Sequence, residues 1–232
     1  MTTTRRRARL AAVLFLITWI TSVAAVPLYG GSALGTGEPL AGRSSVLFAS
    51  ALEVILAAAV VGTALALYPL LRGHDPAGAL GYVALRTLEA GVILVGVVAI
   101  LPAVAIPGST AASGMAPEVV RGLHLLHDWT FVIGPGLINP VNAAVLATVL
   151  WRHRLVAPFI PALGLVGAAL VAVMNLAVLF GFTRPLPALA LPLFAWEISL
   201  ASYLAFRGLR AGLGVGKRGE GGLAPLLSRP RR

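Results

Sequence analysis

The sequence predicts an all-α integral membrane bundle of six transmembrane helices, and three observations support this fold class. Hydrophobic residues make up 58% of the 232 residues, charged residues make up 11%, and the mean hydropathy is +0.92. A soluble domain of this length has too little interior to cover so much apolar side-chain surface. Apolar runs also recur along the whole chain, and each reaches the length of about 20 residues that an α-helix needs to cross a bilayer.

Six apolar segments qualify as transmembrane helices. They are residues 8–30, 45–71, 77–104, 129–151, 155–181 and 186–208. The two longest loops, 31–44 and 105–128, are rich in Gly, Ser and Pro, as surface loops are. We therefore expect residues 1–210 to form one six-helix transmembrane domain. Residues 211–232 are rich in Gly and Arg, which predicts a disordered basic cytoplasmic tail.

The first span follows a basic segment, RRRAR at 5–9. A basic start, an apolar run and the small residues SVA at 22–24 also resemble a secretory signal peptide, whose removal would leave five spans. The apolar run is longer than the core of a signal peptide and continues through Pro27 and Tyr29. This length favours an uncleaved first helix.

The basic residues predict that both termini lie inside the cell, because Lys and Arg are enriched in cytoplasmic loops. With the N-terminus inside, the outer segments contain only Arg43, Arg121 and Arg184, and the other basic residues outside the spans are inside. The net charge of +10 is thus explained by lipid contact rather than by nucleic acid, which we do not expect as a partner. Anionic headgroups are the expected partners of the basic termini.

The second and third spans contain three ionisable residues at membrane depth. Glu53 lies toward the outer side of the second span, while in the third span Glu89 lies near the midplane and Arg86 somewhat toward the inner side. The third helix is expected to begin with Asp75 as its N-cap and Pro76 as its first residue. Arg86 and Glu89 are three residues apart and share one helix face, so they could pair locally.

The fourth span contains GPGLINPVN at 134–142. Proline lacks an N–H group, so Pro135 and Pro140 leave backbone carbonyls without a helical partner. One interpretation is a simple kink whose free carbonyls neighbouring helices satisfy. The other is a broken helix that lines a binding site, with Asn139 and Asn142 on one face.

Just before this span, LHLLHDW at 123–129 places His124, His127 and Asp128 on adjacent helical positions. These residue types can bind a metal, although no fourth ligand is evident. His and Trp also favour membrane interfaces, and Asp128 could cap the helix. We therefore assign no metal site and keep the three residues as candidates.

The fifth and sixth spans each add one polar residue, Asn175 and Glu197. Asn175 could hydrogen-bond between helices. Glu197 falls near the midplane, where an ionised group costs several kcal/mol unless it is paired or hydrated. We expect a buried network in which Arg86 is shared between Glu89 and Glu197. Such a network serves either as a ligand site or as a salt bridge that holds helices together.

Several chemistries have no support in the sequence. There is no cysteine, which excludes disulfides and thiolate sites. There is no GxxxxGK[ST] loop, no GxGxxG turn, no GxSxG elbow and no HExxH pair. No catalytic residue is identified and the cofactor is unknown, so an enzymatic role is the least supported.

The chain resembles the DUF4386 family along nearly its whole length up to about Arg210. The resemblance rests on RRRARLAAVLFLI, ALYPLLRGHDPAGALGYVALRTLEAG, LHDWTFVIGPGLINPVNAAVLATVLWRHRLVAPFIPALGLVGA and FAWEISLASYLAFRGLR, in this order. These are bacterial membrane proteins whose biochemical function is not established. The resemblance implies six spans in a bacterial cytoplasmic membrane and supplies neither a substrate nor a catalytic residue.

Three classes of function remain open. The first is a protein that binds or transports a small molecule or lipid at Arg86, Glu89, Asn139, Asn142 and Glu197. The second is a structural or regulatory membrane protein in which the same residues join helices. The third is a metal-dependent intramembrane enzyme at the His124 segment. A cavity that meets the polar residues would distinguish the first class from the second. The sequence does not determine the oligomeric state.

Overall fold

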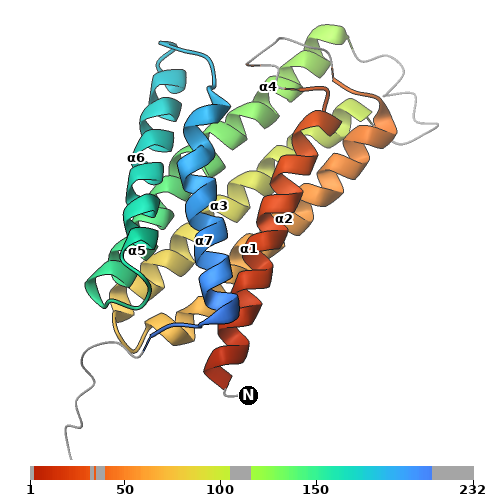
Figure 1. Ribbon diagram of the computed structural model, residues 1–232. Helices are drawn as coiled ribbons and strands as arrows, with labels where there is room; N and C mark the ends of the chain where they lie inside the picture. The colour runs from red at the N-terminus through yellow and green to blue at the C-terminus, as the bar shows by residue number, and fades with distance from the viewer. Residues whose placement is uncertain (1–2, 32–33, 35–39, 105–115, 211–232) are drawn as a thin grey trace, which may run out of the picture.

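The computed structural model describes residues 3–31, 34, 40–104 and 116–210, and this part of the chain is helical without a strand (Figure 1). The elements are α1 (Thr3–Leu28), α2 (Arg43–Leu71), α3 (Pro76–Ile100), η1 (Leu101–Val104), α4 (Pro117–Ile133), η2 (Gly134–Ile138), α5 (Asn139–Arg152), α6 (Phe159–Leu179), η3 (Pro187–Ala190) and α7 (Leu191–Phe206). The predicted tail 211–232 lies outside the described residues.

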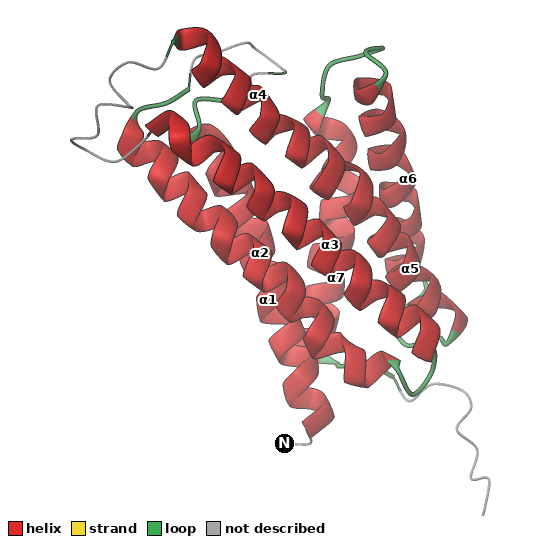
Figure 2. Cartoon of the chain, turned by 180° about the vertical axis from the view of Figure 1, so that it is seen from behind, coloured by secondary structure: helices red, strands yellow, loops and turns green. Residues whose placement is uncertain are grey.

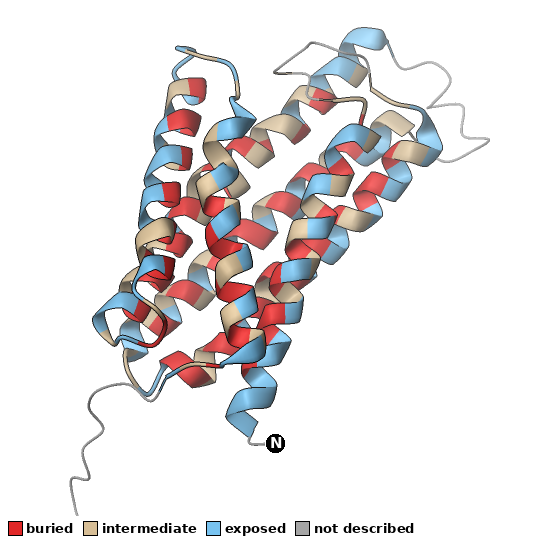
Figure 3. Ribbon diagram, in the orientation of Figure 1, coloured by how far each residue is buried: buried red, intermediate tan, exposed pale blue. Residues whose placement is uncertain are grey.

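The six predicted membrane spans are confirmed. Six helical segments are long and apolar enough to cross a bilayer, namely Thr3–Leu28, Arg43–Leu71, Pro76–Val104, Pro117–Arg152, Phe159–Leu179 and Pro187–Phe206. Exposed residues, pale blue in Figure 3, lie along the outside of the helices, and many of them are large and apolar, such as Leu65, Val98 and Val173. Lipid is the solvent that accommodates such an outer surface.

The spans form a closed ring. Helix α1 packs on α2, α2 on α3, α3 on both α4 and α5, α5 on α6, and α6 on α7, which returns to α1 (Figures 1 and 2). The N-terminal end of α1 and the C-terminal end of α7 lie at the same end of the bundle (Figure 1). This end also contains the turn between α2 and α3, where Asp75 caps α3 as predicted by accepting a 2.8 Å hydrogen bond from the amide of Gly78.

Helix α4 begins at Pro117, earlier than the predicted start of the fourth span at residue 129. Proline is favoured at the first helical position, and Glu118 follows it in the first turn, where negative charge is favourable. The polar residues of this segment lowered its apparent hydropathy. The structure buries His124 and His127 on the bundle side of α4, so they are interior residues rather than loop residues.

The proline-rich part of the fourth span remains helical, and Pro117–Arg152 is one continuous helical segment. Between α4 and α5, residues Gly134–Ile138 form one wide π-helical turn, closed by a hydrogen bond from the amide of Asn139 to the carbonyl of Gly134. The wide turn accommodates Pro135 and Pro140, which lack the N–H group that donates the usual helical hydrogen bond. The helix therefore continues across the membrane with a local widening, and such widenings are frequent at functional sites.

Two glycines bring α6 and α7 into close contact. A Cβ atom on Gly164 would lie 2.7 Å from the indole of Trp196, and one on Gly167 would lie 2.5 Å from the backbone nitrogen of Leu193. Small residues allow membrane helices to approach in this way. Gly91 differs, because a Cβ atom there would meet nothing within 4 Å, so it is not a packing site.

Candidate functional site

Arg86 is the cation at the centre of the bundle. Its side chain is 2% exposed, and its Nη1 lies 3.0 Å from Oε2 of Glu89, one turn along α3. Nη2 donates a 3.3 Å hydrogen bond to Oγ1 of Thr63 on α2. The guanidinium also lies 5.7 Å from the ring centre of Phe15 and 5.8 Å from that of Tyr82. Arg86 thus connects α1, α2 and α3 through charge, hydrogen bonding and cation–π contact.

Glu89 extends this network to α5. The side-chain amide of Asn142 donates a 2.6 Å hydrogen bond to Oε2, the same oxygen that faces Arg86. Asn142 and Glu89 are both buried. Asn139 and Asn142 were predicted to share a helix face. Asn142 bonds to the Arg86–Glu89 ion pair, whereas Asn139 lies near Glu197.

Asn139 and Glu197 form the opposite side of the network. The Glu197 carboxylate, on α7, is near the guanidinium of Arg86, the carboxylate of Glu89 and the amide of Asn139. Oδ1 of Asn139 is buried and has no hydrogen-bond partner among the described residues. The network thus holds one arginine and two glutamates, and Glu197 is the carboxylate that forms no direct ion pair with Arg86.

A cavity of about 320 Å³ opens on this group, and side chains from all six spans line it. Its polar lining residues are Thr18, Trp19, Ser22, Arg86, Glu89, Asn139, Asn175 and Glu197. The other lining residues are apolar or small and include Phe131, Met174 and Phe194. We call this space the central cavity; it combines apolar walls with a few convergent polar groups, as small-molecule sites do.

Asn175 lines the central cavity from α6. Its amide lies directly over Gly136 in the π-helical turn, where a Cβ atom would come within 2.5 Å of Oδ1. Its Nδ2 donates a 2.9 Å hydrogen bond back to the carbonyl of Val171, one turn earlier on α6. Asn175 therefore packs against the widened turn, which needs a glycine at this position.

Glu53 belongs to a second cluster, separate from the Arg86 network. Its Oε2 accepts a 2.9 Å hydrogen bond from the hydroxyl of Tyr29 and lies 3.0 Å from Nε2 of His127. Ser50 lies 3.3 Å from the same tyrosine hydroxyl. This outer cluster joins the end of α1 to α2 and α4, so Glu53 is a partner of His127 rather than of Arg86.

A second cavity of about 180 Å³ adjoins the outer cluster, and Tyr29, Glu53, His127 and Asp128 are among its lining residues. We call it the outer cavity. Three residues, Val26, Phe131 and Asn175, line both cavities, so the two spaces are neighbours. Phe131 also stacks on His127, with their ring centres 5.1 Å apart.

The three candidate metal ligands lie close together, with Nδ1 of His127 at 3.6 Å from Oδ1 of Asp128, but each also has a partner of another kind. His127 faces Glu53, while Nε2 of His124 lies 4.0 Å from Oδ1 of Asp128. Oδ2 of Asp128 accepts a 3.1 Å hydrogen bond from the backbone amide of Leu34. Within the described ranges, no group of three or more His, Asp or Glu side chains is arranged to hold a metal. The observed geometry is that of ion pairs and hydrogen bonds that tie α4 to α2 and to the segment after α1.

Several residues that contribute to these sites gave no clear signal in the sequence. Tyr29 and Thr63 are partners of Glu53 and Arg86, and Trp19 lines the central cavity. A hydroxyl or indole inside an apolar run gives only a weak signal, because such groups also occur where they bond to their own helix or face the interface.

Comparison with known proteins gives a family and no more specific relative. A family model described as a domain of unknown function, DUF4386, matches residues 10–208. No curated protein matches the chain, and no solved structure does. The match spans all six membrane helices and both clusters, and the chain belongs to the DUF4386 family.

Proposed function

We propose that this protein is a membrane-embedded binding protein for a small molecule or lipid, with the central cavity as its ligand site. The observation that carries the proposal is a cavity of about 320 Å³ that meets buried charged groups in the middle of an apolar bundle. Ligand pockets start at about this size, roughly 300 Å³. A transporter would bind its substrate at the same site, so the proposal covers both a binding protein and a transporter.

The main alternative is that the polar residues only hold helices together. Arg86, Glu89 and Asn142 suit that role, because they are buried and bonded to one another across α3 and α5. Purely structural contacts close-pack, however, and leave few voids larger than a water molecule. Arg86, Glu89, Asn139 and Glu197 all line open space, and of these four only Arg86 and Glu89 form an ion pair with each other. The two roles therefore divide between residues: those bonded to one another stabilise the site, and Asn139 and Glu197 are available to a ligand.

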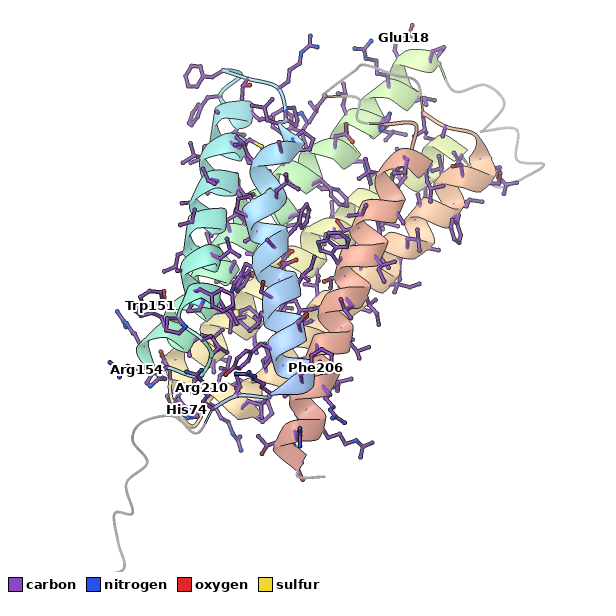
Figure 4. All side chains as sticks on the ribbon, in the orientation of Figure 1. His74, Glu118, Trp151, Arg154, Phe206 and Arg210 are labelled. Atoms are coloured by element: carbon purple, nitrogen blue, oxygen red, sulfur yellow. The ribbon has the colours of Figure 1, made fainter. Side chains whose placement is uncertain are left out.

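The experiment that tests the proposal is native mass spectrometry of the protein released from lipid nanodiscs. Wild type is expected to retain a specific mass beyond bulk lipid, and Glu197→Gln and Asn139→Ala are expected to lose it while still folding. Glu118→Gln is the matched control, since it makes the same chemical change at an exposed residue of α4, away from the cavity (Figure 4). Bulk lipid alone on wild type, with mutants that differ only by unfolding earlier, would support the structural alternative.

We also propose that both termini are cytoplasmic and that the membrane is the bacterial cytoplasmic membrane. Basic residues gather at one end of the bundle, where Arg154 and Arg210 are labelled in Figure 4, and Glu118 lies at the other end. Positive charge favours the cytoplasmic side.

The orientation can be tested with single introduced cysteines, because the chain has no cysteine of its own. On intact cells a membrane-impermeant maleimide should label Glu118→Cys but not Gly73→Cys, and the reverse pattern would invert the orientation.

A further inference from the structure

The two cavities carry charge of the opposite sign to the chain. The protein has a formal net charge of +10, with 18 basic and 8 acidic residues. Four of those eight acidic residues, Glu53, Glu89, Asp128 and Glu197, line the cavities. In the described part of the chain, Arg86 is the one lysine or arginine that does so. His127 also lines the outer cavity, beside Glu53, so four carboxylates face two basic side chains. Acidic groups are thus in excess in the cavities of a basic protein, and concave sites with charge of one sign attract ligands of the other sign.

The central cavity contains one hydrogen-bond acceptor without a partner among the described residues, beside a carboxylate that forms no direct ion pair with Arg86. Arg86 directs its Nη1 to Glu89 and its Nη2 to Thr63, so its bonds go to residues other than Glu197. Oδ1 of Asn139 has no hydrogen-bond partner among the described residues and lies in the same wall as Glu197. A carboxylate beside a free amide oxygen is suited to a positively charged group with N–H donors.

Two donors also lack partners at this cavity, namely Nε of Arg86 and Nε1 of Trp19. A water molecule or an oxygen atom of a ligand can satisfy either of them. The carboxylate of Glu197 is different, because Arg86 pairs directly with Glu89 and water alone does not balance a charge at membrane depth. The charge therefore decides the class of ligand more strongly than the free donors do.

The remaining walls of the central cavity are aromatic and aliphatic. Trp19 and Phe194 meet edge to face with ring centres 5.6 Å apart, and both line the cavity. Phe131 lines it from α4, and Met174 from α6. Aromatic faces attract cations, and aliphatic walls favour an apolar ligand body.

We infer that the ligand is a protonated amine with an apolar body, whose ammonium group donates hydrogen bonds to Glu197 and to Oδ1 of Asn139. The apolar body then lies against Trp19, Phe131 and Phe194. This inference rests on the proposed function, because it names the ligand class of the same central cavity.

The outer cavity is consistent with the passage of such a cation. Its charged lining groups are Glu53 and Asp128, with His127 between them, and no lysine or arginine lines it in the described part of the chain. It adjoins the central cavity at Val26, Phe131 and Asn175. An amine that enters through the outer cavity therefore meets carboxylates before it reaches Glu197.

Equilibrium dialysis against protein in nanodiscs, with empty nanodiscs subtracted, tests this inference. The probe is 2-phenylethylamine at pH 7, compared with the uncharged 2-phenylethanol and the anionic 3-phenylpropanoate, which have similar bodies. We expect saturable binding of the amine and weaker binding of the other two. Glu197→Gln should weaken amine binding roughly 10-fold to 100-fold, the effect of losing a hydrogen bond to a charged group. Glu118→Gln should leave it unchanged.

A second variant keeps the test valid if Glu197→Gln does not fold. Asn139→Leu removes the free acceptor from another helix and should also weaken the amine selectively. If the alcohol or the anion binds as tightly as the amine, the ligand is not a cation and the inference is overturned, although the binding function stands. If none of the probes binds saturably, the inference is again overturned. Native mass spectrometry then shows independently whether the wild-type protein retains any ligand in the central cavity.

Discussion

Replacing Arg86 with methionine should destabilise the bundle more than any other single change in the central network. Methionine keeps an unbranched apolar stem of similar reach but removes the only cation that faces Glu89 and Glu197 in the described part of the chain. The ion pair at 3.0 Å, the hydrogen bond to Thr63 and the cation–π contacts are all lost. Removing one partner of a buried ion pair costs about 3–5 kcal/mol.

Neutralising Glu89 should cost less, because Arg86 then still has Glu197 as a counter-charge. Glu89→Gln weakens one charge-assisted hydrogen bond at 3.0 Å and alters the acceptor of Asn142. Hydrogen bonds to charged groups contribute about 1.5–3 kcal/mol. The structure therefore predicts an order, in which Arg86→Met is more destabilising than Glu89→Gln. In the double mutant the cost should be less than the sum of the two, since both changes remove the same pair.

The assay is reversible unfolding in mixed micelles during a titration with sodium dodecyl sulfate, followed by tryptophan fluorescence. The matched control is Arg121→Met, which removes an arginine from an exposed position of α4 and should change the free energy of unfolding by less than about 0.5 kcal/mol. The reasoning is refuted if Arg86→Met unfolds no more easily than Arg121→Met. It is also refuted if Glu89→Gln costs more than Arg86→Met, since Glu197 would then not balance the arginine.

Three further predictions concern packing, the cavity and the outer cluster. Gly164→Ala should destabilise by about 1–3 kcal/mol in the same assay, because its Cβ atom meets the indole on α7 at 2.7 Å, whereas Gly91→Ala should be neutral or slightly stabilising because its Cβ atom meets nothing. Ser22→Leu should fill part of the central cavity and abolish both the retained mass and amine binding, while the unfolding midpoint stays at or above that of wild type; a retained ligand would place the site elsewhere. Tyr29→Phe should cost about 1–3 kcal/mol because it removes the 2.9 Å hydrogen bond to the buried carboxylate of Glu53, and an unchanged free energy of unfolding would show that this bond contributes nothing.

Part of the central site was visible in the sequence. Arg86 and Glu89 lie three residues apart on one predicted helix, and local spacing of this kind places two side chains on the same face. Contacts between helices were not accessible in the same way. The bond from Asn142 to Glu89 and the pairing of Glu53 with His127 and Tyr29 join residues that are far apart in the sequence. Nothing in the pattern of one helix specifies which face of another helix it meets.

The fourth span shows why hydropathy alone was insufficient. Its polar residues made the segment before residue 129 resemble a loop, yet α4 begins at Pro117 and buries His124 and His127. The proline pattern predicted a disturbance but did not specify its form, which is a single π-helical turn at Gly134–Ile138. In that turn the amide of Asn175 packs over Gly136, and this is a tertiary contact that the local pattern does not specify.

By itself the sequence determined the solvent, the number of spans, the family resemblance and the list of polar residues that must be accounted for inside the bilayer. These follow from composition and from local periodicity, because each span must satisfy its own backbone and present apolar side chains to lipid. The tertiary structure decided which polar residues meet and that they form two clusters. It also decided that Glu197 and Asn139 border a cavity rather than being packed on all sides. The reason is physical: the rotation and neighbours of each helix are set by close packing at glycines and by interhelical hydrogen bonds, and these depend on all six spans together.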